Sequence, residues 1–171
     1  MVILILFLPA AAAACPVGWT PSPASTTCFL VPPERSTSLF RCVDLCEEHG
    51  GTPACIGSAE ENDFVLAELA ATDGLWLGLY QNETGLGPAK GWDRCVAGDA
   101  PSFTWHEGQP DDYHGYQQDC AWVDAGQWRD LACDGGVRFS LNRLAELSCL
   151  CARGNASAAF AGDLGALEAT T

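Results

Sequence analysis

The chain of 171 residues carries 8 basic and 22 acidic side chains, a formal net charge of −14. Such an acidic surface repels phosphate backbones, sulfated glycans and anionic lipid, so we expect no nucleic-acid binding. No segment after the first residues is long and apolar enough to span a bilayer, so we expect no membrane insertion either. Neutral sugars, divalent cations and basic proteins remain possible partners, or the acidity serves only solubility. Ten cysteines in so short a chain indicate a disulfide framework made in an oxidising compartment, and thus a secreted, extracellular protein.

The first residues predict a secretory leader. Residues 2–8 form an apolar run, and residues 12–14 are alanines of the kind that signal peptidase accepts. The run is much shorter than the roughly 20 residues that span a bilayer. We therefore expect a signal peptide over 1–14, a folded domain over 15–152 and a disordered tail over 153–171.

The beginning of the domain predicts a hairpin, a strand and a helix. Cys15 and Cys28 enclose a segment with prolines and small residues, which is typical of a hairpin clipped at its base, and residues 28–31 follow as a strand. A helix is expected over 36–50, because serine or threonine can cap its start and two glycines end it. A short strand is expected over 52–56.

A second helix is predicted after Ser58. This serine precedes Glu61 by three residues, which is the spacing of a capping box, and an apolar run including Phe64 and Leu69 supplies the buried face. Asp73-Gly74 is expected to end the helix. Residues 75–80, LWLGLY, predict a buried strand.

The second half of the domain is expected to be mostly loop from Gln81 to Gln118. This stretch is rich in Gly, Pro, Asp and Gln, and loops of such length inside a compact domain are uncommon and usually functional. Short strands are then predicted over 119–123, 127–130 and 136–140, and a single closing strand over 147–151. Four tryptophans are expected in the core rather than at a ligand site: Trp76, Trp92, Trp122 and Trp128.

Six segments, in this order, resemble the C-type lectin-like family. They are CPVGW with the next cysteine, CEEHGGTPACIGSAEENDFV, WLGL, FTWHEGQPDD, DCAWV with GQWRDLAC, and LSCLC. The resemblance implies an α+β fold in which two helices flank small antiparallel sheets, with a long ligand-binding loop and many disulfides. It also implies sugar binding, with glycans or glycoproteins as partners.

The cysteine spacings predict a framework in which all ten are oxidised. Cys120 and Cys133 flank a short strand-turn-strand, so a bridge between them is easily formed. Cys42 and Cys46 lie about 6 Å apart on one face of the expected helix, and Cys149 and Cys151 lie about 6 Å apart on one face of the closing strand. Two stacked bridges between the helix and the strand therefore fit, and the spacing leaves open which helix cysteine pairs with which strand cysteine. Cys55 and Cys95 remain as a pair by elimination. With three histidines and no CxxC pair, metal binding by these cysteines is not expected.

The resemblance places the binding site in the long loop. Gln109-Pro110-Asp111 matches the motif that the family associates with galactose-type sugars, whereas the mannose-type motif has Glu and Asn. In calcium-dependent members the proline is typically cis and the flanking oxygens hold the ion. Tyr113 lies where galactose-type members often carry an aromatic ring, whose face covers the apolar side of galactose.

The resemblance thus implies sugar contacts from Gln109, Asp111, Tyr113, Gln118 and Asp130, and calcium bound by the same set without Tyr113. The sequence departs from the calcium-binding pattern at two positions. Gln118 replaces the usual Glu, and Arg129, which has no acceptor, replaces the usual Asn before Asp130. Either Arg129 lies inward, bridges Asp111 and Asp130 and replaces the ion, or it lies outward and a weak site survives.

Two functions follow. The first is a lectin that recognises a terminal galactose-type sugar with the help of calcium. The second is a calcium-independent module of the same fold that binds a protein, a mineral or ice. An enzyme is not expected, because the sequence contains no Ser-His-Asp or Cys-His arrangement, no HExxH and no phosphate-binding loop.

Overall fold

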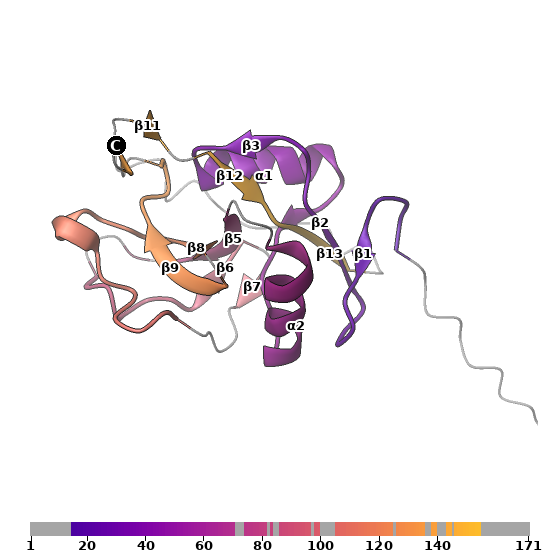
Figure 1. Ribbon diagram of the computed structural model, residues 1–171, viewed down its shortest axis with the longest axis horizontal. Coiled ribbons are helices and arrows are strands. Elements are labelled where there is room, and N and C mark those ends of the chain that lie inside the picture. The colour runs from indigo at the N-terminus through magenta and orange to yellow at the C-terminus, as the bar shows by residue number, and fades with distance from the viewer. Residues whose placement is uncertain are drawn as a thin grey trace, which may run out of the picture.

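The computed structural model describes residues 15–70, 74–81, 83, 86–96, 98–99, 105–124, 126–135, 138–139, 143–144 and 146–154. It confirms an α+β fold with two helices, small sheets and many disulfides. The N-terminal hairpin lies at one end of the molecule and the long loop at the other (Figure 1). The expected leader and the chain beyond 154 lie outside the described residues. Within those residues, no helix is long and apolar enough to span a bilayer.

The N-terminal hairpin belongs to a four-stranded antiparallel sheet in the order β1-β2-β13-β4. Its strands are β1 (Thr20–Pro21), β2 (Thr27–Leu30), β13 (Cys151–Gly154) and β4 (Thr52–Pro53). The sheet joins the two ends of the domain, because β13 pairs with both β2 and β4. Strand β13 runs two residues beyond the domain boundary expected at 152, and β4 is shorter than the strand expected over 52–56.

A seven-stranded sheet forms the centre of the molecule. Its main path is β3 (Arg35–Ser36), β12 (Leu147–Cys149), β5 (Leu75–Tyr80), β6 (Arg94–Cys95) and β7 (Gly98–Asp99). Strand β8 (Cys120–Asp124) pairs with β5 and with β9 (Gln127–Leu131), which confirms the hairpin expected there. A separate pair is formed by β10 (Arg138–Phe139) and β11 (Arg143–Leu144).

The closing segment LSCLC is two strands rather than the single strand expected. Leu150 separates them and is fully buried. Its N–H donates to the carbonyl of Trp76 in one sheet (3.2 Å), and its carbonyl accepts from Ala54 beside the other sheet (2.7 Å). The chain therefore passes from one sheet to the other at Leu150, which the apolar pattern of the segment does not reveal.

Helix α1 (Leu39–Glu48) begins three residues later than expected. The reason is local, because Ser36 lies in β3 and its hydroxyl hydrogen-bonds the backbone of Ser38 at both N–H and carbonyl. Ser38 is then the N-cap, and its Oγ accepts from the N–H of Arg41 at 3.2 Å. Gly50 follows the helix with φ 79°, a left-handed conformation that suits glycine at a helix end.

Helix α2 (Ala59–Phe64) continues as the π-helix η1 (Val65–Leu69). The Ser58 hydroxyl caps the N–H of Glu61 at 3.1 Å, as expected for the first half of a capping box. The return contact differs, because the buried Glu61 carboxylate accepts from the N–H of Gly57 at 2.8 Å and from the hydroxyl of Ser22 at 2.8 Å. Glu61 therefore joins the helix to the N-terminal hairpin. Asp73, the expected stop, lies outside the described residues.

Strand β5 is buried as predicted, and Gly78 in its WLGL motif allows a close approach of the backbone. A Cβ at Gly78 would lie 2.5 Å from the carbonyl oxygen of Pro53 in β4. The Gly78 N–H donates to the carbonyl of Ala54 at 2.7 Å. A side chain at this position would therefore separate the two sheets.

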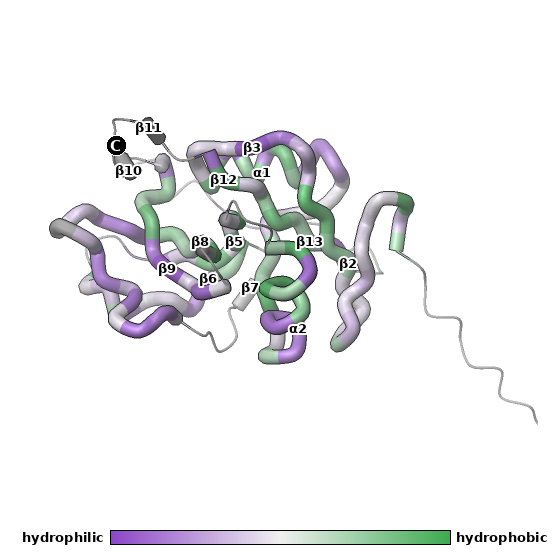
Figure 2. The backbone as a smooth tube through the Cα atoms, in the orientation of Figure 1, coloured by the Kyte–Doolittle hydropathy of each residue, from purple (hydrophilic) through white to green (hydrophobic). Residues whose placement is uncertain are grey.

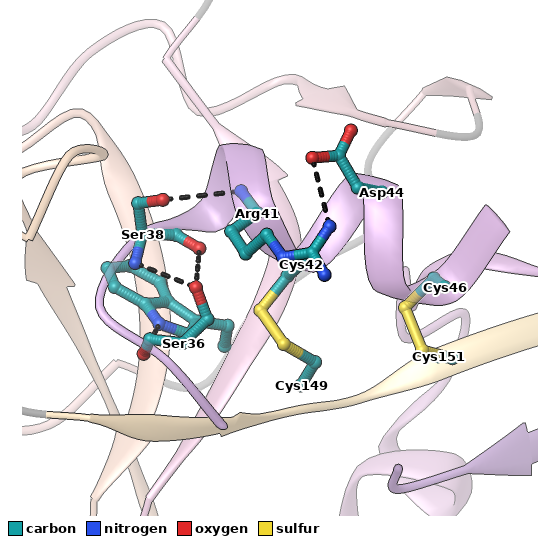
Figure 3. The surroundings of a disulfide bond; sticks show 9 residues. Ser36, Ser38, Arg41, Cys42, Asp44, Cys46, Cys149 and Cys151 are labelled. Atoms are coloured by element: carbon teal, nitrogen blue, oxygen red, sulfur yellow. Dashed lines mark hydrogen bonds and ion pairs between the residues drawn. A yellow bond between two sulfur atoms is a disulfide. The ribbon is translucent and has the colours of Figure 1, made fainter. Parts of the chain in front are cut away.

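Five disulfides pair all ten cysteines, namely Cys15–Cys28, Cys42–Cys149, Cys46–Cys151, Cys55–Cys95 and Cys120–Cys133. The predicted bridges Cys120–Cys133 and Cys55–Cys95 are confirmed. Of the two pairings left open for the stacked bridges, the structure has Cys42 with Cys149 and Cys46 with Cys151. Figure 3 shows the two stacked bridges between α1 and the closing strands. Two apolar clusters meet at the central sheet, one including Phe29 and Trp128 and the other including Trp76 and Trp122.

Candidate functional site

The long loop connects β5 to β8 and lies at the end of the molecule opposite the N-terminal hairpin (Figure 1). It is less irregular than expected. Its described residues include β6, β7 and a 3₁₀ turn, η2 (Tyr113–Gly115). Strands of two residues are too short to show an alternating pattern, which is why the sequence did not predict them. The part of the loop around η2 is mostly hydrophilic (Figure 2).

Three tryptophans support the base of this loop. The rings of Trp92 and Trp105 are 4.7 Å apart, and those of Trp105 and Trp128 are 6.2 Å apart, both in edge-to-face arrangements. The indole N–H of Trp128 donates to Oδ1 of Asn62 in α2 at 2.7 Å. The buried Trp92 and Trp128 confirm the core role expected for them.

The predicted binding motif forms a tight turn. The peptide bond between Gln109 and Pro110 is cis, as the resemblance implied. The Gln109 N–H donates to the carbonyl of His106 at 2.9 Å. Asp112 has φ 47° and ψ 50°, the left-handed region that short polar side chains tolerate better than most. The turn thus directs the N–H groups of Asp111 and Asp112 toward the same side.

Asp130 on β9 holds this turn. Its Oδ2 accepts from the N–H of Asp111 at 2.9 Å and from the N–H of Asp112 at 2.8 Å. In return, the Asp130 N–H donates to Oε1 of Gln109 at 3.3 Å. Hydrogen bonds to an ionised carboxylate are stronger than neutral ones, so Asp130 is the main anchor of the turn.

Gln118 holds the turn from the other side. Its Oε1 accepts from the N–H of Tyr113 at 2.7 Å, and its own N–H donates to Oδ1 of Asp112 at 3.1 Å. Gln118 and Asp130 are only 3% and 4% exposed. Both side chains position the loop, and the sugar contacts that we predicted for them stay predictions.

Two buried carboxylates near the turn, those of Asp119 and Asp130, have raised pKa values. Burial, followed by the carboxylates of Asp112 and Asp130, raises the pKa of Asp119 to about 6. Burial also raises the pKa of Asp130, against the lowering effect of the backbone hydrogen bonds that it accepts, and the charge of Asp111 raises it further.

Most side-chain oxygens of the calcium set implied by the resemblance already accept hydrogen bonds within the loop. Calcium takes about six to eight oxygens. Here Gln109 and Gln118 each give the side-chain oxygen to a backbone N–H, and Asp130 does so with Oδ2. Among the described residues no hydrogen-bond partner meets the buried Oδ1 of Asp130, and Arg129 supplies no oxygen. Across the described part of the chain, no three His, Cys, Asp or Glu side chains are grouped so that they could hold a metal.

The accessible side of the loop carries a different set of groups. Asp111 is exposed and Gln109 half-buried, and Tyr113 is 56% exposed, so these three predicted contacts can meet a ligand. Sequence reasoning missed Tyr116, which is 59% exposed, and the positioning role of Asp112. The polar residues around Tyr116 in the sequence indicated an exposed turn, so exposure of this tyrosine was predictable. The hydrogen bond that Asp112 accepts from the N–H of Gln118 exists only in the folded turn.

Comparisons with known proteins agree with this architecture. The family described as Lectin C-type domain matches residues 35–139. The mouse scavenger receptor C-type lectin carbohydrate-recognition domain is 22% identical, with 82% of this chain and 98% of that chain covered and a TM-score of 0.64. The lectin domain of murine dendritic cell inhibitory receptor 2, solved in complex with N-glycan, is 21% identical, covers 82% and 99%, and has a TM-score of 0.61.

A third solved structure is described as independent of calcium. It is a calcium-independent type II antifreeze protein, 24% identical, with 82% of this chain and 95% of that chain covered and a TM-score of 0.63. The fold of the chain is thus shared by domains that bind carbohydrate and by a domain that is independent of calcium.

Proposed function

This chain belongs to the C-type lectin domain family, and from that premise we propose that its long loop binds a neutral, galactose-type sugar without requiring calcium. The observation that carries the proposal is the exposed pair Asp111 and Tyr113, with the half-buried Gln109 beside them, on a turn that Asp130 and Gln118 hold in place. A binding role, rather than catalysis, is what family membership supports. The fully paired cysteines support a secreted protein.

The exposed groups are suited to a sugar. Gln109 offers the donor of its side-chain amide, since its Oε1 accepts from the Asp130 N–H, while the Asp111 carboxylate offers acceptors only. The axial 4-hydroxyl of galactose leaves a continuous apolar C–H face, which the ring of Tyr113 can cover. The glycan complex of the dendritic cell receptor domain is a precedent for such a ligand on this fold.

Independence from calcium is supported by the hydrogen bonds within the loop. In this chain, Asp130 and Gln118 bind the N–H groups of Asp111, Asp112 and Tyr113, and these bonds hold the turn without an ion. The calcium-independent antifreeze protein is a precedent for the fold without that requirement.

Calorimetry and glycan-array binding, each with calcium and with a chelator, test the proposal. Galactose or N-acetylgalactosamine should bind with Kd around millimolar, about −4 kcal/mol, and mannose more weakly. Tyr113→Ala should cost about 1 kcal/mol of binding free energy, because the stacking face is lost. Val17→Ala, at an exposed site on the N-terminal hairpin, is the matched control and should change nothing.

Two results would contradict the proposal in different ways. A preference for mannose would remove the galactose-type assignment. Binding that disappears with chelator would show that calcium takes part after all. If no sugar binds under either condition, the second function becomes the better one: a calcium-independent module for a protein, mineral or ice surface, which the self-contained hydrogen bonding of the loop also favours.

A further inference from the structure

Two exposed tyrosines lie close together on the candidate loop. Among the described residues, the exposed large hydrophobic side chains are Val17, Tyr113 and Tyr116. Val17 lies on the N-terminal hairpin, whereas Tyr113 opens the turn η2 and Tyr116 follows it directly. Large apolar side chains exposed together, rather than singly, are the ones that indicate an interaction site.

The turn sets the spacing of the two rings. Tyr113 opens η2, and the N–H of Tyr116 donates to the carbonyl of Tyr113 at 3.4 Å. Gly115 lies between them in the left-handed region (φ 73°), and the first and last residues of such a tight turn have Cα atoms less than about 7 Å apart. This separation is close to the length of one monosaccharide unit, so the two positions suit neighbouring sugar rings.

The turn is also held before any ligand arrives. Gln118 binds the N–H of Tyr113, and Asp112, which precedes it, is bound by both Asp130 and Gln118. The N–H of Gly115 closes the turn on the carbonyl of Asp112 at 2.7 Å. An aromatic pair on a fixed turn loses little conformational freedom on binding, which favours recognition by stacking.

We infer that Tyr113 and Tyr116 form a paired stacking platform that recognises at least a disaccharide, with Tyr116 covering the sugar next to the terminal galactose-type residue. This inference rests on the proposed function. Tyr116 is then a specificity-determining residue that selects extended glycans over single sugars.

The charges around the platform restrict the class of glycan further. Glu107 and Asp111 are exposed on the same loop, and Asp112 lies beside Tyr113. Such a cluster repels sulfate and sialic acid carboxylate and accepts neutral sugars. The platform therefore takes neutral oligosaccharides, and a sulfated or sialylated version of the same glycan binds less tightly, most clearly at low salt.

Calorimetry with methyl β-galactoside and with lactose tests the platform on the full domain. Wild-type protein should bind lactose more tightly than the monosaccharide. Tyr116→Ala should reduce the ratio of the lactose affinity to the methyl β-galactoside affinity by about three- to tenfold, because one stacked ring is lost. Tyr116→Phe should retain this gain in affinity because the ring remains. Tyr113→Ala should weaken both sugars together and leave the gain in place.

The outcomes separate the inference from the proposed function. If galactoside binds but lactose gains nothing, or if Tyr116→Ala leaves the gain intact, the platform is wrong and the proposed function stands. If neither sugar binds, both are wrong. Equal weakening of both sugars by Tyr116→Ala would show a general contact rather than a second stacking position. An unchanged melting temperature of each variant shows that the fold is retained.

Discussion

The framework and the long loop of this domain are stabilised by different forces. The framework joins α1 to β12 and β13 through Cys42–Cys149 and Cys46–Cys151, with buried apolar side chains around them. The loop instead depends on a few polar atoms, chiefly those of Asp130 and Gln118. The framework can therefore tolerate exchange of surface polar residues, whereas a change of one carboxylate can reshape the loop.

The strongest test of this comparison removes the stacked bridges. Each closes a chain segment of more than one hundred residues, with separations of 107 and 105. The first bridge is worth about 5 kcal/mol by loop-closure entropy, but once it is present the second closes only a short residual loop, worth about 2 kcal/mol. Replacing either pair by alanine should cost about 2 kcal/mol, and replacing both about 7 kcal/mol.

Denaturant unfolding of the two double variants and the quadruple variant measures these costs. A loss of about 7 kcal/mol is comparable with the whole stability of a domain, so the quadruple variant is expected to be unfolded. Additive losses would show that the two bridges do not constrain the same part of the unfolded chain.

Asp130→Ala tests the loop. It leaves the N–H groups of Asp111 and Asp112 without their acceptor, and we expect a loss of about 1–3 kcal/mol in local stability and of sugar binding, with the framework intact. Hydrogen exchange should accelerate at these two amides and not in β5 or β12. Asp44→Ala, on the exposed surface of α1, is the matched control and should have little effect. Equally faster exchange in β5 would mean that Asp130 supports the whole fold.

The pH dependence of stability should originate in the loop. Because the folded-state pKa of Asp119 is raised to about 6, the folded protein binds more protons than the unfolded chain between about pH 4 and 6. The free energy of unfolding should therefore fall as pH rises through this range, by about 1 kcal/mol once solvent screening is allowed for. Burial of Asp130 acts in the same direction.

Asp119→Asn should flatten this profile and raise the melting temperature at pH 7.5. Thermal unfolding of both proteins between pH 4 and 8 measures the effect, and Glu60→Gln at an exposed position is the control. A wild-type profile that rises from pH 4 to 6 would contradict the burial of these carboxylates.

The smallest effect is expected from rebuilding a calcium set. Gln118→Glu with Arg129→Asn removes one positive charge, adds a carboxylate and restores two oxygen ligands. Calcium at a few times Kd should then stabilise the double variant by less than about 1 kcal/mol, seen as a rise in melting temperature. The wild-type protein should show no such rise. If the double variant also shows none, the loop is not related to calcium sites in the way that the resemblance implies.

Much of the fold follows from short patterns in the sequence. Ser58 and Glu61 marked the start of α2, residues 75–80 marked the central strand, and the spacing of Cys120 and Cys133 predicted their bridge. The two-residue strands and the change of sheet at Leu150 were not predictable, because no periodicity exists over so few residues and because both depend on partners distant in the chain.

For the site residues, too, some features follow from the sequence and others only from the tertiary structure. The sequence by itself determined the family, because its motifs lie along the chain in a recognisable order, and the resemblance then implied the cis bond at Gln109-Pro110 and the position of the candidate loop. Only the tertiary structure decided that Asp130 and Gln118 hold the loop, and that Asp119 has a raised pKa. The direction of a carboxylate oxygen and its access to water are set by neighbours that the chain brings from far away, such as the amides that lie 18 and 19 residues before Asp130.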